Sequence, residues 1–241
     1  MSSMREQDAA PVKRSRGRPE GVVNKREAIL DAAEEVFAEA GYAGTSLRDI
    51  VERANVTKGL VNYYFGSKEN LFQEVFLRRG APIAAKRLER LAELTAREDR
   101  ALTLQDLVRA FLQPSIQMPR TDSALRFFRI QARLHMEQEE FAYSLRRKLY
   151  EESTLAYARA IQSVAPHLSE KTVYWRLILM VGANLYAVSD THRINELSGS
   201  KFDAADQGEL LDQVTAFVCG GFAAPDPSPE HNAASAPKRR R

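Results

Sequence analysis

Residues 45–67 read TSLRDIVERANVTKGLVNYYFGS, and this stretch decides the fold of the N-terminal part of the chain. Ser46 and Thr57 can each cap the start of a helix, and Asp49, three residues after Ser46, completes a capping box. Gly66 then stops the second helix. Two short helices joined by a tight turn have the geometry of a helix-turn-helix, so the sequence predicts that motif here.

The segments on both sides of this stretch also follow a helical pattern. Asn24 can cap a first helix, which Gly41 ends, and Ser67 can cap a fourth helix. Apolar residues recur along the first helix at the spacing of one helical face: Ile29, Ala32, Ala33, Val36, Phe37 and Ala40.

The remainder of the chain shows similar helix starts and stops. Pro82 is predicted to start a helix, Pro114 to end one, and Gly220-Gly221 to end the last. No run of residues alternates as a strand does, so the sequence predicts an all-α fold. The further helices have the approximate ranges 82–97, 103–113, 122–135, 138–164, 169–190 and 206–219.

Composition narrows the class of protein. The 241 residues are 44% hydrophobic and contain one cysteine, which excludes an internal disulfide framework and a multi-cysteine zinc site. We find no signal-peptide pattern and no apolar segment of the roughly 20 residues that span a bilayer. The sequence therefore predicts a cytoplasmic protein without a membrane partner.

The net charge of +3 is unevenly distributed. Residues 1–26 hold seven Lys or Arg against three acids, whereas residues 27–79 hold six basic and nine acidic residues. A basic arm on a globular body predicts a polyanionic partner, and a solubilising tail is the alternative. The predicted parts are a flexible basic arm (1–23), a helix-turn-helix domain (24–79), an effector-binding and dimerisation domain (80–223) and a disordered basic tail (224–241).

Residues 27–76 resemble the DNA-binding domain of TetR-type transcriptional regulators. This resemblance implies an all-helical, dimeric, ligand-binding domain over about 80–223. The run VNYYFGSK, from Val61, resembles a subgroup that includes regulators of fatty-acid metabolism. The segments that carry the family resemblance are ILDAA (29–33), FAEAGY (37–42), TSLRDI (45–50) and VTKGLVNYYFGSKE (56–69).

Side chains of the second predicted short helix have the chemistry to read DNA. Asn62 can pair bidentately with adenine in the major groove. Thr57 and Lys58 stand at the start of that helix, where base edges or phosphates are reached. Gly59 allows a close approach of the backbone.

Other polar groups around the motif suit phosphate contacts. Tyr63 and Tyr64 can donate their hydroxyls to phosphates, and Lys68 lies beside the capped start of the fourth helix. Arg48 resembles the family position that reaches a base or a phosphate. In the arm, Arg16 and Arg18 stand in the sequence RGRP, which resembles the core of an AT-hook and predicts contact with a narrow A·T minor groove; nonspecific phosphate attraction is the alternative.

An effector pocket is expected among the helices of the C-terminal domain. Arg126, Arg129 and Arg133 recur on one helix face and could hold an anionic head group, although a solvated face is the simpler interpretation. The candidate lining residues are Phe111, Phe127, Phe128, Arg129, Arg133, Leu134, Met136, Trp175, Leu179 and Met180.

Two C-terminal helices suggest a homodimer. The segment 173–188 is apolar on nearly all faces, and 206–222 adds a second apolar face. Such helices must be covered, either by a second subunit across a two-fold axis or by an intramolecular core. The candidate interface residues are Val181, Leu185, Leu211, Val214, Phe217 and Val218.

The sequence thus predicts a dimeric, ligand-released repressor of a palindromic DNA operator, with a small hydrophobic or amphipathic effector such as a fatty acid or an acyl thioester. A DNA-binding regulator or architectural protein without an effector is the alternative. We expect no enzyme activity, cofactor or metal, because the histidines are isolated and no phosphate loop or catalytic motif occurs.

Overall fold

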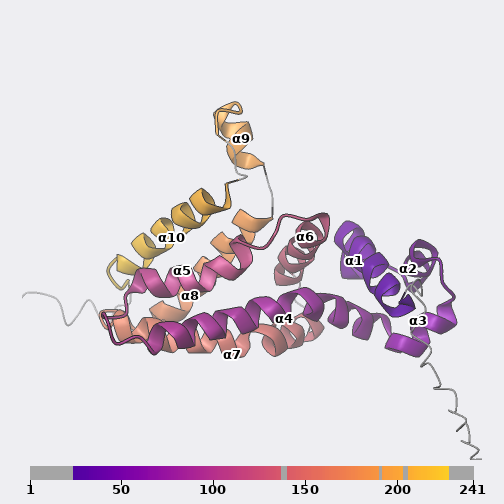
Figure 1. Cartoon of the computed structure of the whole chain (residues 1–241), viewed down its shortest axis with the longest axis horizontal. Helices are drawn as coiled ribbons and strands as arrows, with labels where there is room; N and C mark the ends of the chain where they lie inside the picture. Colours follow the sequence, from indigo (N-terminus) through magenta and orange to yellow (C-terminus); the bar gives the residue numbers. More distant parts are fainter. Residues whose placement is uncertain (1–23, 137–139, 190–191, 203–205, 228–241) are drawn as a thin grey trace, which may run out of the picture.

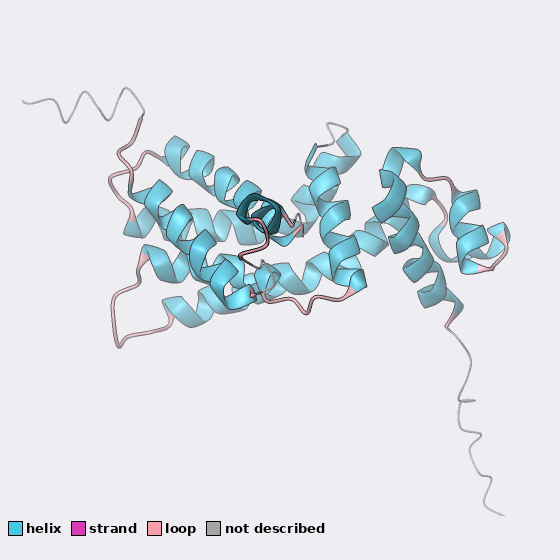
Figure 2. Cartoon of the chain, turned by 90° about the horizontal axis from the view of Figure 1, so that it is seen from above, coloured by secondary structure: helices cyan, strands magenta, loops and turns pink. Residues whose placement is uncertain are grey.

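The computed structural model describes residues 24–136, 140–189, 192–202 and 206–227, and every regular element in these ranges is a helix (Figure 2). The prediction of an all-α fold is confirmed. The predicted contacts of Arg16 and Arg18 lie outside the described residues. The helices are α1 (Lys25–Gly44), α2 (Leu47–Ala54), α3 (Lys58–Phe65), α4 (Lys68–Thr95), α5 (Leu104–Ile116), α6 (Asp122–Met136), α7 (Glu140–Val164), α8 (Glu170–Val188), α9 (Arg193–Ser198) and α10 (Gln207–Ala223).

The local signals of the N-terminal helices act as the sequence predicts. The Ser46 hydroxyl accepts from the backbone N–H of Asp49 at 3.2 Å, and the Asp49 carboxylate accepts from the N–H of Ser46 at 2.8 Å. Thr57 caps α3, and Asn55 ends α2 in the left-handed conformation. The path of α1 breaks at Gly41, whose φ of +73° favours glycine. These caps fix α2 and α3 as the two helices of the motif.

A small core holds α1, α2 and α3 against the start of α4. Phe37 is fully buried and meets the Phe72 ring edge-on, with the centroids 4.8 Å apart. Ile50 of α2 and Val61 and Phe65 of α3 complete this core. The inward side chains of α3 are therefore fixed, which determines the face that it turns outward.

Helix α4 connects this N-terminal bundle to the rest of the molecule (Figure 1). It runs unbroken over 28 residues with Pro82 inside, so the prediction of a helix boundary at Pro82 is wrong. Proline removes one helical hydrogen bond, but burial of Phe76 and Ile83 on either side stabilises the continuous helix.

Two other predicted helix ends are also displaced, and one helix was not expected. Helix α5 passes Pro114 to Ile116, and α10 passes Gly220-Gly221 to Ala223. Tertiary packing of Ile116 and Phe222, both buried, outweighs the local stop signals there. The short helix α9 lies over residues for which the sequence predicted no element.

The C-terminal helices pack around α5, which contacts α4, α7, α8 and α10. Its side chains Leu107, Val108, Phe111 and Leu112 are fully buried. Helix α6 contacts α4 and α8 of this group and also packs beside α1 (Figure 1). It therefore links the C-terminal helices to the N-terminal bundle.

Gly80 marks a close approach of α4 and α7, and its substitution tests this packing. A Cβ atom at Gly80 would lie 2.3 Å from Leu149 Cδ2. We expect Gly80→Ala to lower the free energy of unfolding by about 1–3 kcal/mol, because buried Leu149 must move. Gly59→Ala is the matched control, since the nearest atom to its Cβ would be 4.0 Å away. Urea denaturation of both variants measures the difference, and equal stability would contradict the close packing.

Candidate functional site

Helix α3 presents one polar face at the end of the molecule. Lys58, Gly59, Asn62 and Tyr63 are exposed on it, and the Tyr63 side chain is 81% exposed. Among the described residues, none covers these groups, and none packs closely enough to require a glycine at position 59. A short capped helix with an uncovered polar face suits insertion into a major groove.

The other predicted contact residues around α3 have roles inside the protein. The Thr57 hydroxyl accepts from the N–H of Leu60 at 3.3 Å, and Arg48 forms an exposed ion pair with Glu52 at 2.8 Å. Tyr64 is half-exposed, with its ring against that of Tyr63. The structure thus brings the predicted α3 residues together on one helix, whereas Arg48 lies on the preceding helix α2 and pairs there with Glu52.

Lys68 holds the helix-turn-helix together. Its ammonium group donates to the carbonyl oxygens of Tyr42 and Thr45, both at 2.9 Å, and lies 4.3 Å from the centre of the Tyr42 ring. These contacts join the start of α4 to the turn between α1 and α2. A contact of Lys68 with phosphate would have to share an ammonium group that two carbonyl oxygens already engage.

The acidic residues of α1 are paired with arginines of neighbouring helices. Glu34 is only 1% exposed, and it accepts from Arg78 of α4 at 2.8 Å and from Ser123 of α6. Arg79 of α4 and Arg126 of α6 lie 3.4 and 3.7 Å away. We call these five residues the Glu34 cluster. Because this cluster takes up acidic charge of α1, the net negative charge of the motif does not describe the face of α3.

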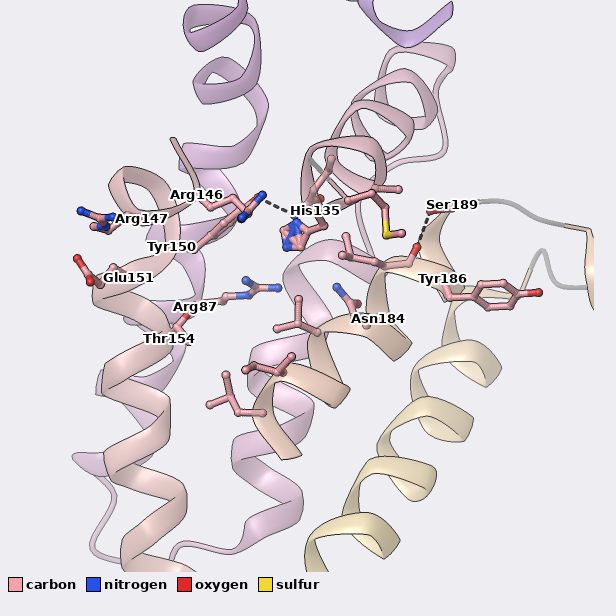
Figure 3. Close-up of a pocket in the computed structure, with 18 residues that line it drawn as sticks. Arg87, His135, Arg146, Arg147, Tyr150, Glu151, Thr154, Asn184, Tyr186 and Ser189 are labelled. Atoms are coloured by element: carbon pink, nitrogen blue, oxygen red, sulfur yellow. Dashed lines mark hydrogen bonds between the residues drawn. The ribbon is translucent and has the colours of Figure 1, made fainter. Parts of the chain in front are cut away.

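A cavity of about 920 Å³ lies between α4, α6, α7 and α8 (Figure 3). Most of its wall is apolar, and α8 contributes much of that surface. Its size falls within the usual range of small-molecule sites. The apolar lining from α8 includes Leu177, Ile178, Val181 and Leu185, with Tyr186 at the same wall. The polar and charged lining residues include Arg87, Gln131, His135, Arg146, Arg147, Tyr150, Glu151 and Asn184.

Arg87 is a buried cation in the wall of this cavity. It is 5% exposed, its Nε donates to the Phe111 carbonyl oxygen at 2.9 Å, and its guanidinium carbon lies 3.7 Å from the centre of the Phe111 ring. Burial lowers the pKa of Arg87 to about 10, so the side chain remains charged at neutral pH. No sequence pattern marks Arg87 as a buried cation, because it lies on a helix with charged residues on several faces.

Two further polar groups face the cavity. Burial, with the nearby Arg146 charge, lowers the pKa of His135 to about 4, so the imidazole is neutral at pH 7. Its Nδ1 is buried without a hydrogen-bond partner. Gln131 donates to the Tyr150 hydroxyl at 2.8 Å, and burial raises the pKa of Tyr150. The cavity thus combines an apolar wall with a few convergent polar groups.

Most of the residues that the sequence predicted for an effector pocket lie outside this cavity. Of that set, Met136 lies in the cavity wall, at its exposed edge. Phe111 is packed behind Arg87. Trp175 and Leu179 are exposed on the outer face of α8, and Arg129 is also exposed. The remaining candidates, all packed in the hydrophobic core, are Phe127, Phe128, Leu134 and Met180.

The predicted head-group arginines are used elsewhere. Arg126 approaches Glu34 and Glu35 of α1, and Arg133 donates to the Glu39 carbonyl oxygen at 3.0 Å. Helical spacing placed them on one face correctly, but that face lies against α1 and not in the cavity.

The residues predicted for the dimer interface lie in three different environments. Leu211 and Val218 point into the core, whereas Val181 and Leu185 line the cavity. Val214 is half-buried beside the exposed Phe217. The structure instead shows a group of large exposed apolar side chains that the prediction missed apart from Phe217: Trp175, Ile178, Leu179 and Tyr186 of α8 with Phe217 of α10.

The described helices also bear on membrane spans and metal sites. None of the described helices combines the length and apolar character needed to cross a membrane. Within the described residues, no three His, Cys, Asp or Glu side chains come together as metal ligands.

Comparison with known proteins relates both parts of the chain to one family. Residues 29–75 match the model of the bacterial regulatory proteins of the tetR family, and residues 109–221 match that of the tetracyclin repressor-like C-terminal domain. A TetR-like transcriptional regulator from Rhodococcus sp. RHA1 has a TM-score of 0.55 at 22% identity, covering 85% of this chain and all of that one. The HlyIIR mutant with residues 170–185 substituted by alanine has a TM-score of 0.53 at 21% identity, covering 80% and 94%.

Curated relatives match a quarter or less of this chain. The HTH-type transcriptional repressor Rv3405c of Mycobacterium tuberculosis is 46% identical over 61 residues, which are 25% of this chain and 32% of that protein. The repressor AcnR of Corynebacterium glutamicum is 43% identical over 49 residues, 20% and 26% of the two chains. The chain thus spans a third or less of these relatives. With both family models matched in their proper order, the chain belongs to the TetR family of bacterial regulatory proteins.

Proposed function

We propose that this protein is a ligand-responsive transcriptional repressor, which binds a palindromic DNA operator as a homodimer and is released by a small effector in the cavity. The observation that carries this proposal is helix α4. It begins directly after α3 and carries Arg87 into the cavity wall. Helix α4 therefore adjoins the proposed DNA-reading helix α3 and also lines the cavity, so it can couple the two sites.

The DNA contacts are assigned to the exposed face of α3. Asn62 is proposed to read adenine, and Lys58 with Tyr63 to contact phosphates. Gly59 supports this assignment, because it is exposed and packing within the described residues leaves room for a side chain there, so the glycine is free to serve a close approach to DNA. Arg16 and Arg18 of the arm are proposed to extend the contact into the minor groove.

The exposed apolar side chains of α8 and α10 are proposed as the dimer interface. Leu179 is 66% exposed and Phe217 is 75% exposed in the single chain, although both are large and apolar. Large exposed apolar patches mark interaction sites. A two-fold pairing of this face would cover the patch and place two α3 helices on successive major grooves.

The Glu34 cluster is proposed to transmit the effector signal together with α4. Helix α6 lines the cavity with Gln131 and His135, and at its other end it holds Ser123 and Arg126 against Glu34 of α1. A shift of α6 or α4 on effector binding would thus move α1 and the motif packed on it. The two relatives named as repressors support repression as the sign of regulation.

Replacement of two α3 side chains separates base contacts from phosphate contacts. On operator fragments selected from the parent genome, we expect Asn62→Ala to weaken specific binding by about 1–3 kcal/mol. Lys58→Ala should weaken binding to all sequences and lower the salt slope by about 1. Fluorescence anisotropy at several salt concentrations measures both. An unchanged sequence preference in Asn62→Ala, or selection of no fragment at all, would overturn the assignment.

A charge on the apolar face tests the interface. We expect Leu179→Glu and Phe217→Glu to yield monomers, because the carboxylate would be buried without a partner in the dimer. Tyr63→Glu is the control, since Tyr63 is 81% exposed on α3, at the other end of the molecule from α8 and α10 (Figure 1). Light scattering coupled to size exclusion gives the masses, and a dimer that persists in both variants would place the interface elsewhere.

Removal of the Glu34 charge tests the joint between the two parts of the chain. We expect Glu34→Gln to lower the free energy of unfolding by about 1–3 kcal/mol, because the half-buried Arg78, Arg79 and Arg126 lose the buried carboxylate at their centre. Asp31 and Glu35 still pair with Arg78 and Arg126. Glu89→Gln, which breaks an exposed pair with Lys86, should change it by about 0.5 kcal/mol or less. Similar effects of the two substitutions in urea denaturation would show that the cluster does not hold the joint.

A further inference from the structure

The cavity holds one buried positive charge for which the described residues offer no counter-ion. Arg87 is 5% exposed, and no carboxylate in the described residues forms an ion pair with it. Buried charges in proteins are normally paired, and removing an unpaired cation from water is costly. Arg87 therefore lacks the structural partner that its burial would lead one to expect.

The contacts of Arg87 inside the protein satisfy one part of the guanidinium group. Its Nε donates to the Phe111 carbonyl oxygen, and the Phe111 and Tyr150 rings lie 3.7 and 5.7 Å from its carbon. Figure 3 shows the end of the side chain reaching into the cavity. The terminal amino groups, which bind a carboxylate in the bidentate geometry, are thus the ones that face the cavity.

The surroundings of this cation define the rest of the ligand. His135 turns toward the same space, and its Nδ1 has no hydrogen-bond partner (Figure 3). Leu177, Val181 and Leu185 of α8 provide an apolar wall. The acidic group of the lining, Glu151, lies on the exposed surface of α7. A ligand that fits has one anionic end and an apolar body.

We propose that the cavity binds an amphipathic monocarboxylate, with its carboxylate on the terminal amino groups of Arg87 and its apolar body along α8. Arg87 is the buried guanidinium of the lining, whereas Arg146 is half-buried and Arg147 is exposed. One buried guanidinium matches a single negative charge better than the double charge of a phosphate monoester. This inference rests on the proposed function, because it names the chemical class of the effector. It also places the anionic end on α4, the helix that leads directly to α3.

Matched probes test the charge. Dodecanoate and dodecanamide have the same apolar chain and differ in charge, and calorimetry at pH 7.5 on the full chain without DNA gives both affinities. We expect wild type to bind dodecanoate roughly 10-fold or more tightly than dodecanamide, because a charge-assisted bidentate pair forms out of water. Equal affinities would overturn the proposal. Tighter binding of dodecyl phosphate than of dodecanoate would overturn the assignment to a carboxylate.

Variants locate the charge that acts. Arg87→Met should reduce the preference to about 2-fold or less while dodecanamide still binds, with folding checked by circular dichroism. Arg147→Gln is the control, because Arg147 lines the same cavity but is exposed and lies near Glu140 at 3.8 Å. It should keep the preference. A preference that survives in Arg87→Met, or disappears in Arg147→Gln, would show that Arg87 is not the anchor.

A second substitution covers the case in which Arg87→Met does not fold. Arg87→Lys keeps the charge but loses the bidentate geometry, so dodecanoate affinity should fall roughly 3- to 10-fold and dodecanamide affinity should stay. An equal loss for both probes would overturn the proposal. Operator release by dodecanoate is measured separately: binding without release would contradict the proposed function and leave the carboxylate site in place.

Discussion

The continuity of α4 is the constraint on which the arrangement of this protein depends. The helix begins one turn after the end of α3, supplies Phe72 and Phe76 to the core, and continues past Pro82 to form the wall of the cavity. Its close approach to α7 at Gly80 leaves no room for a side chain. Because α4 is one continuous helix that packs against α3 and lines the cavity, it joins the two regions directly.

Electrostatic pairing makes this mechanical link specific. The acidic residues of α1 do not oppose a DNA partner as the charge count alone suggests, since arginines of α2, α4 and α6 pair with them. Glu34 is the buried centre of this arrangement. The same ion pairs that neutralise the acidic residues of α1 also hold α1 against α4 and α6, two of the four helices that line the cavity. One set of contacts therefore both neutralises the acidic residues of α1 and attaches the N-terminal bundle to the C-terminal helices.

The cavity shows the opposite electrostatic situation. Arg87 is charged at neutral pH, yet its compensation inside the protein comes from a carbonyl oxygen and the faces of aromatic rings. Neutral His135 adds no counter-charge. The apolar wall and the buried Arg87 together suit a ligand with an apolar body and a negative charge, whereas a buried charge without a counter-ion would destabilise a closed hydrophobic core. This contrast with the paired Glu34 cluster supports the proposal that the cavity is a binding site and the cluster a structural joint.

The sequence alone was enough to specify the two helices of the helix-turn-helix. Ser46, Asp49 and Thr57 specify α2 and α3 through hydrogen bonds between near neighbours, and these caps occur in the structure as predicted. The polar face of α3 followed from the same local pattern, because Val61 and Phe65 must turn inward. The family resemblance followed from the spacing of these residues, and the comparisons confirm it.

The tertiary structure alone decided which face of each later helix meets which neighbour. Helical periodicity shows that Arg126 and Arg133 share a face, but not that this face lies against α1. It could not identify Arg87 as the buried cation, nor predict that α4 continues through Pro82. The physical reason is that local signals are worth about 1 kcal/mol each, whereas burial of several large side chains contributes more and depends on residues far apart in the chain.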